Sequence, residues 1–217
     1  MPKILVVDDE EQLLGILRDV LEDEGYKVLT ASSGPVALDI LEKEKVDLVL
    51  LDIMMPEMDG WAVVEEINKR PHIKDVPIAM LTVKTLSPQY FYSDATERLI
   101  DYINKPFSNK VLKERVKNIL ETRSRMESIK ESLRASAPDF VGEYEELLRT
   151  EKLYENLLKS LEFSLTKMEK SSSDYKLIKD AFNYASVLLE EIKKKREAHE
   201  RLIEETKLTF SRPSGSA

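Results

Sequence analysis

Residues Leu48–Asp52, which read LVLLD, indicate the type of fold because four apolar residues follow one another without alternation and end on an acid. A strand covered on both faces needs such a continuous apolar run, whereas a half-exposed strand alternates apolar and polar residues. Residues Ile4–Val7, which read ILVV, show the same pattern and run directly into Asp8 and Asp9. Both stretches therefore predict buried parallel strands, each followed by acidic side chains.

Further apolar runs of strand length recur along the first half of the chain. The expected strands are Lys3–Val7, Lys27–Ala31, Val46–Leu51, Val76–Leu81 and Leu99–Ile103. Apolar residues at helical spacing occupy the segments between them, in Leu13–Leu21, Val36–Leu41 and Trp61–Ile67. The alternation of strand and helix predicts an α/β fold, a doubly wound (βα)5 parallel-sheet domain over residues 1–121.

The helical pattern continues past the point where this domain should end. We expect residues 122–139 to form a helical linker that extends the last helix of the domain as far as Pro138. Residues 140–210 then alternate apolar positions by three and four on either side of a turn, which predicts an all-α helical hairpin or coiled-coil module with helices at about 140–170 and 174–209. A lone hairpin buries only one seam, so we expect a homodimer through this module. The Ser/Gly/Pro-rich residues 211–217 are expected to be a disordered tail.

Composition and charge exclude several classes of protein. The 217 residues include no cysteine, which excludes disulfides, thiolate metal sites and cysteine nucleophiles. No run approaches the ~20 apolar residues of a membrane span, and no signal peptide precedes the first strand, so we expect a cytoplasmic location. Residues 1–121 hold 15 basic against 23 acidic residues, whereas the remainder holds 18 of each. An acidic chain with a neutral second half has no general attraction to nucleic acid.

Polar side chains gather at the carboxyl edge of the expected sheet. Each ends or directly follows a strand: Asp8, Asp9, Asp52, Thr82 and Lys105. Clustered carboxylates repel one another unless a cation lies between them, and hard oxygen ligands suit Mg²⁺. Such a metal can bridge a carboxylate nucleophile and an incoming phosphoryl group. The pattern therefore predicts a magnesium site at which Asp52 is the nucleophile and Lys105 and Thr82 bind the phosphoryl oxygens.

Over residues 1–121 the chain resembles the CheY-like receiver domains of two-component response regulators. The stretches that carry the resemblance are Ile4–Glu10, Leu51–Gly60, Ile78–Thr82 and Tyr102–Phe107. It implies that a sensor histidine kinase donates a phosphoryl group from a phosphohistidine to Asp52. The helical second half is not assigned to a family.

The resemblance also implies the metal ligands. Asp8, Asp9 and Asp52 would bind Mg²⁺, and the backbone carbonyl of Met54 would complete the metal shell. The chain is then an autocatalytic phosphoryl acceptor with slow autophosphatase activity. We expect no separate catalytic domain, because the second half shows no paired spacing of catalytic residue types.

Further roles follow from the same resemblance. Thr82 is the switch hydroxyl, Tyr102 is the switch aromatic, and Lys105 contacts the phosphate and precedes a cis Pro106. Simple packing is the alternative interpretation of Tyr102, as for any lone aromatic residue in a strand. Thr82 is followed by Val83, where many receivers carry a smaller residue, so slow dephosphorylation is a hypothesis.

The segment before the fifth strand departs from the family pattern. Residues Asp94–Arg98 lack the usual Gly-Ala, so the preceding helix is expected to be shifted or differently bounded. Its aromatic residues Tyr90, Phe91 and Tyr92 either contribute to a partner surface or pack within the helix.

We expect the second half to be an interaction module whose partner is unknown. Three alternatives stay open. A histidine-phosphotransfer or kinase-dimerisation helix pair would need an exposed helical histidine, for which His199 is the candidate, without the proline that usually follows shortly afterward. A DNA-binding output lacks helix-turn-helix spacing here. A dehalogenase-like phosphatase would need a second aspartate where this chain has Met54.

Overall fold

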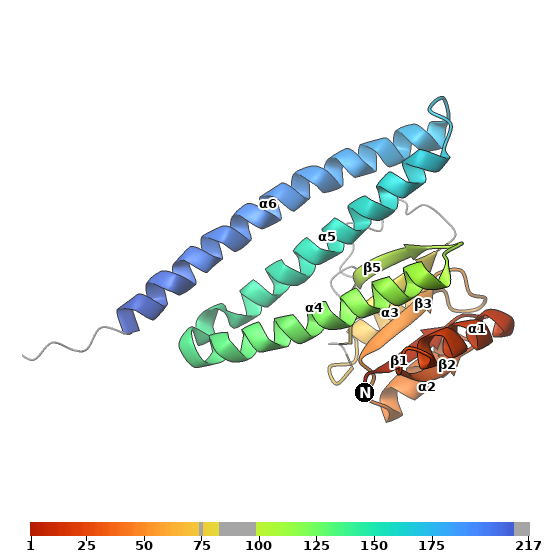
Figure 1. The fold of residues 1–217 in the computed structure, drawn as a ribbon, viewed down its shortest axis with the longest axis horizontal. Coiled ribbons are helices and arrows are strands. Elements are labelled where there is room, and N and C mark those ends of the chain that lie inside the picture. The colour runs from red at the N-terminus through yellow and green to blue at the C-terminus, as the bar shows by residue number, and fades with distance from the viewer. Residues whose placement is uncertain (74–75, 83–98, 211–217) are drawn as a thin grey trace, which may run out of the picture.

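The computed structural model describes residues 1–73, 76–82 and 99–210. The hypotheses on Val83, on the aromatic residues 90–92, on the segment 94–98 and on the tail 211–217 concern residues outside these ranges. Figure 1 shows the order and arrangement of the helices and strands. Within the described ranges, no helix is long and apolar enough to cross a lipid bilayer.

The part of the chain that the structure describes contains a five-stranded parallel sheet with strand order β2-β1-β3-β4-β5. Its strands are β1 Lys3–Val7, β2 Lys27–Ala31, β3 Leu48–Asp52, β4 Ile78–Thr82 and β5 Leu99–Asn104. Every residue of β3 is buried, as its continuous apolar run predicted. The doubly wound α/β class is therefore confirmed for this part of the chain.

Helices cover both faces of the sheet (Figure 1). They are α1 Glu11–Glu22, α2 Gly34–Lys43, α3 Gly60–Asn68 and α4 Asn109–Ser136. Ile4 and Val6 of β1 pack in one apolar core with α1 and α4. Leu5 and Val7 point the other way and pack in a second core with α2 and α3. Both faces of β1 are thus removed from water.

The turn between β3 and α3 depends on a glycine. A Cβ atom at Gly60 would lie 2.4 Å from the carbonyl oxygen of Asp52, so only glycine lets α3 begin this close to the strand end. Asp59 caps the helix, since its Oδ1 accepts a hydrogen bond of 2.8 Å from the amide of Ala62. Together these residues hold α3 against the end of β3, next to Asp52.

Helix α4 extends well beyond the sheet that its first turns cover. It runs for 28 residues without interruption, as the continuing helical pattern predicted. Leu112 and Val116 pack on the sheet, whereas Leu133 packs near the other end of the helix in a separate apolar cluster with Tyr144 and Ile203. The short 3-10 helix η3, Pro138–Phe140, ends the extension.

The second half forms the expected all-α hairpin. Helix α5, Val141–Lys167, and helix α6, Ser173–Phe210, run antiparallel and side by side (Figure 1). Their bounds lie close to those that the spacing of apolar residues predicted.

The position of α5 differs from the expectation that the hairpin buries a single seam. Helix α5 packs on β5, and its residues Leu153, Leu157 and Leu161 share one apolar core with Tyr102 of that strand. These leucines form the second apolar stripe, which shares its core with Ile178, Ala181 and Ala185 of α6 as well as with the sheet. The receiver sheet of the same chain therefore covers these leucines, and the homodimer expected from the sequence stays a prediction.

Candidate functional site

The structure brings together an ammonium and two carboxylates at the carboxyl edge of the sheet. Lys105 Nζ lies 2.6 Å from Asp8 Oδ2 and 2.6 Å from Asp52 Oδ1. Asp8 and Asp52 are only 1% and 3% exposed. Their charges are therefore poorly solvated and depend on Lys105 for compensation.

The register of the strands explains why Asp8, Asp52 and Lys105 lie next to one another. Strands β1 and β3 are parallel neighbours in which Val7 lies opposite Leu51, so Asp8 and Asp52 follow at the same level. Lys105 comes directly after β5, and its amide donates a hydrogen bond of 2.6 Å to a backbone carbonyl of β4. The peptide bond between Lys105 and Pro106 is cis, as the family resemblance implied.

Backbone amides hold the remaining oxygen of each carboxylate. The amide of Glu10 donates to Asp8 Oδ1 at 3.0 Å, and the amide of Met54 donates to Asp52 Oδ2 at 2.8 Å. Both carboxylates are therefore oriented by fixed donors and by Lys105 at the same time. Met54 thus contacts Asp52 through its amide, while the role of its carbonyl as a metal ligand stays a prediction.

The ammonium of Lys105 is held in its charged form. Burial lowers its pKa, but the hydrogen bonds and the attraction from Asp52 and Asp8 outweigh burial and raise the pKa above its ordinary value. One ammonium facing two carboxylates leaves a net negative charge, and the exposed Asp9 adjoins them. The edge of the sheet therefore still attracts a cation.

The donor chemistry of this edge fits Mg²⁺. In the described ranges, no three acidic or histidine side chains converge closely enough to hold a metal, and Lys105 provides the positive charge between Asp8 and Asp52. Carboxylate and carbonyl oxygens are nevertheless the ligands that Mg²⁺ prefers. Asp8, Asp9 and Asp52 would hold the ion, which would neutralise charge on a phosphoryl group.

Comparison with known proteins decides the family. The model of the response regulator receiver domain matches residues 4–117, just over half of the 217 residues. The chain belongs to the response regulator receiver family. This confirms the resemblance drawn from the sequence motifs, and residues beyond 117 lie outside the match.

Individual relatives cover the same half of this response regulator. Response regulator SaeR of Staphylococcus aureus (strain USA300) is 39% identical over 120 residues, which is 55% of this chain and 51% of SaeR. The chain thus spans about half the length of the curated relatives it matches.

Solved receiver structures also match little more than half of this chain. Chemotaxis protein CheY4 of Vibrio cholerae is 31% identical, covers 55% of this chain and 99% of its own, and superposes with a TM-score of 0.52. A receiver domain from Clostridium thermocellum is 28% identical over 58% of this chain and 99% of its own, with a TM-score of 0.51.

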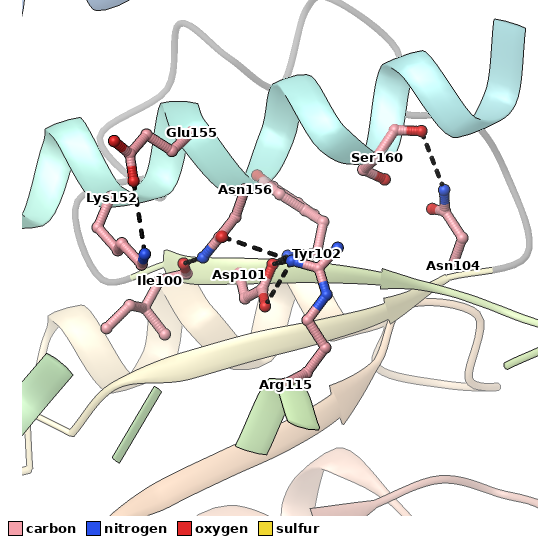
Figure 2. Close-up of polar contacts among 9 residues, drawn as sticks. All are labelled: Ile100, Asp101, Tyr102, Asn104, Arg115, Lys152, Glu155, Asn156 and Ser160. Atoms are coloured by element: carbon pink, nitrogen blue, oxygen red, sulfur yellow. Dashed lines mark hydrogen bonds and ion pairs between the residues drawn. The ribbon is translucent and has the colours of Figure 1, made fainter. Parts of the chain in front are cut away.

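The two hypothesised switch residues of this receiver domain are both buried. Thr82, 1% exposed, ends β4 beside the strand that carries Asp52. Tyr102, also 1% exposed, points from β5 toward α5 (Figure 2). Among the described residues its hydroxyl has no hydrogen-bond partner, and burial, with a smaller effect of Tyr154, raises its pKa. The side chain of Tyr102 therefore packs against α5.

Sequence reasoning missed a buried polar cluster where α5 meets the receiver domain (Figure 2). Arg115 Nη1 lies 3.1 and 3.2 Å from the two carboxylate oxygens of Asp101, which is 1% exposed. Asn156 of α5 donates from Nδ2 to the carbonyl oxygen of Ile100 at 3.0 Å. Burial outweighs the attraction of Arg115 and raises the pKa of Asp101 to about 6.

The missed cluster left a signal in the sequence. Asp101 is a lone acid inside the buried strand LIDYIN, where a solvated charge has no place. Asn156 and Ser160 stand at helical spacing among the leucines of the second apolar stripe, and both are buried. Buried polar groups require partners, so their presence on one helix face points to a polar surface opposite.

The candidate histidine of a phosphotransfer helix is occupied by other contacts. His199 Nδ1 lies 3.1 Å from the carbonyl oxygen of Lys195, and Nε2 lies 3.0 Å from Glu143 Oε2. Its ring also meets Phe140 edge-on, and its side chain is 15% exposed. Because both ring nitrogens have partners, neither is presented freely to a phosphoryl donor.

Proposed function

We propose that this response regulator accepts a phosphoryl group on Asp52 from a sensor histidine kinase. The observation that carries the proposal is the position of Lys105 Nζ, 2.6 Å from both Asp8 and Asp52. A fixed ammonium beside an oriented, buried carboxylate suits the charge that gathers around a transferring phosphoryl group.

The transfer needs an attacking oxygen and charge stabilisation. A carboxylate oxygen of Asp52 attacks phosphorus in line with the bond to the donor imidazole nitrogen. The new O–P bond forms as the N–P bond breaks, and the electron pair of the N–P bond returns to the imidazole nitrogen. Lys105 then pairs with a phosphoryl oxygen, and the hydroxyl of Thr82 donates to another. Mg²⁺ bound by Asp8, Asp9 and Asp52 would supply further charge neutralisation.

In this proposal the chain is a phosphoryl acceptor, and no separate catalytic domain is expected. Hydrolysis of the phosphoaspartate would give a slow autophosphatase activity, which returns Asp52 to its free form. The cytoplasmic location expected from the sequence belongs to the same proposal.

The helical second half is proposed as the output, a module for protein interaction and dimerisation. Large apolar side chains are exposed along α6: Leu177, Tyr184, Val187 and Leu202. Exposed apolar residues that recur along one helix suit contact with another protein, either a second copy or a separate output protein. The occupied nitrogens of His199 disfavour the phosphotransfer alternative.

Acetyl phosphate and Mg²⁺ test the acceptor. After incubation, intact-protein mass spectrometry should show the added mass of one phosphoryl group. Asp52→Asn should abolish the gain, whereas Asp39→Asn, on the exposed side of α2, should retain it. A mass gain that persists in Asp52→Asn, or no gain in the unaltered protein, would refute the proposed acceptor.

Light scattering tests the output. The molar mass of the full chain should change when beryllofluoride, a phosphoryl mimic, is added with Mg²⁺. An unchanged mass together with unchanged partner affinity would remove dimerisation or partner binding as the phosphorylation-dependent output.

A further inference from the structure

A cavity of about 320 Å³ lies where helix α5 meets the receiver domain. Strand β5, helix α4 and helix α5 each contribute residues to its wall. Asp8, Asp52 and Lys105 are not among the residues that line it, so it is separate from the phosphorylation site. Because both halves of the chain line the cavity, a molecule bound there contacts both halves at once.

More of the charged side chains that line this cavity are basic than acidic. The cations are Arg115 of α4 and Lys152 and Lys159 of α5, and the carboxylates are Asp101 and Glu114. Three cations against two carboxylates leave one positive charge in excess. Both lysines lie close enough to Asp101 to stabilise its charged form, as Arg115 does. A hollow with such an excess of positive charge attracts anions.

Arg115 has hydrogen-bond donors that its protein contacts do not use. A guanidinium carries N–H groups on Nε, Nη1 and Nη2. In the described part of the chain, the hydrogen bonds of Arg115 to Asp101 and Asn156 all use Nη1 (Figure 2). Nε and Nη2 are therefore left for another acceptor. Their parallel N–H groups match two oxygens of a phosphate group.

The two lysines flank the polar centre of the cavity. Lys152 and Lys159 stand on α5 about one helical turn before and after Asn156. Asn156 is 4% exposed and accepts a hydrogen bond from Arg115 Nη1 at 3.4 Å. Lys152 Nζ lies 3.4 Å from Glu155, whereas Lys159 is exposed and makes no ion pair with any described residue. Lysine side chains are long and flexible, so both can close on a group beside the guanidinium.

We propose that this cavity binds a small molecule that carries a phosphate group, held by Arg115, Lys152 and Lys159. The phosphate oxygens accept hydrogen bonds from Nε and Nη2 of the guanidinium and from the two ammonium groups. The volume lies at the lower end of the ~300–1,000 Å³ typical of small-molecule sites, so a small organic substituent fits beside the phosphate group. The bound molecule bridges α4 and α5 and thereby stabilises the contact between the two halves.

Asp101 competes with this ligand for Arg115. Its carboxylate oxygens lie 3.1 and 3.2 Å from Arg115 Nη1, and burial raises its pKa to about 6. The charged groups that face it are Arg115 from α4 and Lys152 and Lys159 from α5, and Glu114 of α4 lines the same cavity. A proton on Asp101 removes one negative charge and loosens its hold on the guanidinium. Anions should therefore bind more tightly as the pH falls through about 6.

Calorimetric titration of the full chain with glycerol phosphate, in buffer without Mg²⁺, tests the site. The unaltered protein should bind it. Replacing both lysines, by Lys152→Gln with Lys159→Gln, should weaken binding by about tenfold or more, because two charge-assisted hydrogen bonds are lost. Lys176→Gln with Lys194→Gln, at exposed positions of α6, changes the total charge equally and should leave the affinity unchanged. Circular dichroism establishes that each variant retains its helices.

Titration with sulfate supplies the second measurement, since sulfate keeps its double charge over the pH range in which Asp101 titrates. The affinity of the unaltered protein should rise by about threefold or more between about pH 7.5 and about pH 5.5. Asp101→Asn should bind sulfate tightly at both pH values and lack this rise.

Three results would overturn the site. They are no binding of glycerol phosphate or sulfate, equal affinity in the variant that lacks Lys152 and Lys159, and an equal pH dependence in Asp101→Asn and the unaltered protein. None of these results bears on Asp52, whose phosphorylation is measured separately by the mass gain from acetyl phosphate.

Discussion

Arg115 Nη1 lies 3.1 Å from Asp101 Oδ1, inside the contact between the receiver domain and helix α5. Burial dominates over this ion pair and raises the pKa of Asp101 from 3.8 to about 6. Between these two values the folded protein binds more protons than the unfolded chain. The contribution of Asp101 to the free energy of unfolding must therefore fall as the pH rises from 3.8 to about 6.

The first prediction concerns this pH dependence. Relative to Asp101→Asn, the unaltered protein should lose on the order of 2 kcal/mol of unfolding free energy as the pH rises from about 4 to about 6. Urea denaturation of both proteins across this range gives the difference in their unfolding free energies. The contributions of the other titrating groups cancel in this difference. A difference that stays constant or increases with pH would contradict the assignment.

The second prediction concerns Lys105. Lys105→Ala leaves Asp8 and Asp52 buried without their cation, so the unfolding free energy without Mg²⁺ should fall by roughly 2 kcal/mol. Mg²⁺ should bind this variant more tightly, since no ammonium competes for the carboxylates, while acetyl phosphate should modify it more slowly. Calorimetry and mass spectrometry measure the two effects, and Lys117→Ala on the exposed side of α4 is the control. Unchanged Mg²⁺ binding would show that the ion does not use these carboxylates.

A third prediction compares two glycines. Gly60→Ala places a Cβ 2.4 Å from the backbone oxygen of Asp52, so we expect a loss of roughly 2 kcal/mol or more and impaired phosphorylation. Gly15→Ala in α1 meets nothing within 4 Å and should instead stabilise the protein by about 0.5–1 kcal/mol. Thermal unfolding separates the two outcomes. Equal effects would mean that the close approach at Gly60 is not required.

The fourth prediction tests the apolar contact between the halves of the chain. Leu157→Ala, at a residue 1% exposed, should cost about 2–5 kcal/mol and lower the unfolding midpoint of both halves together. Leu177→Ala, at a residue 51% exposed, should change the stability by less than about 0.5 kcal/mol. Far-ultraviolet circular dichroism follows the helices, and emission of Trp61 follows the receiver core. Separate midpoints would show that the two halves unfold independently.

The elements that sequence predicted best are those with an unambiguous local pattern. Leu48–Asp52 has a continuous apolar run, and the structure buries all of it in the centre of the sheet. The predicted parallel sheet also placed Asp8, Asp52 and Lys105 together, because parallel strands end at the same edge, and the structure brings these three side chains into contact. The metal and switch roles of these residues stay predictions.

The sequence does not identify the partner of an apolar stripe that more than one surface can cover. The stripe of Leu153, Leu157 and Leu161 is apolar whichever surface covers it, and nothing local distinguishes a second copy from the strand β5. Asn156 and Asp101 are far apart in sequence, so neither indicates the other. Their relationship exists only once α5 has folded back onto the sheet.

Periodicity along short stretches and the fixed geometry of parallel strands were enough to predict the α/β fold and the edge of the sheet at which Asp52 lies, and the motifs at that edge indicated the family. The packing of α5 over Tyr102 and its contact with Asn104 beside Lys105 became visible in the folded chain alone. Hydrophobic burial is non-directional, so any of several surfaces can cover the same apolar stripe. The surface that covers it is the one that competes best in the folded chain.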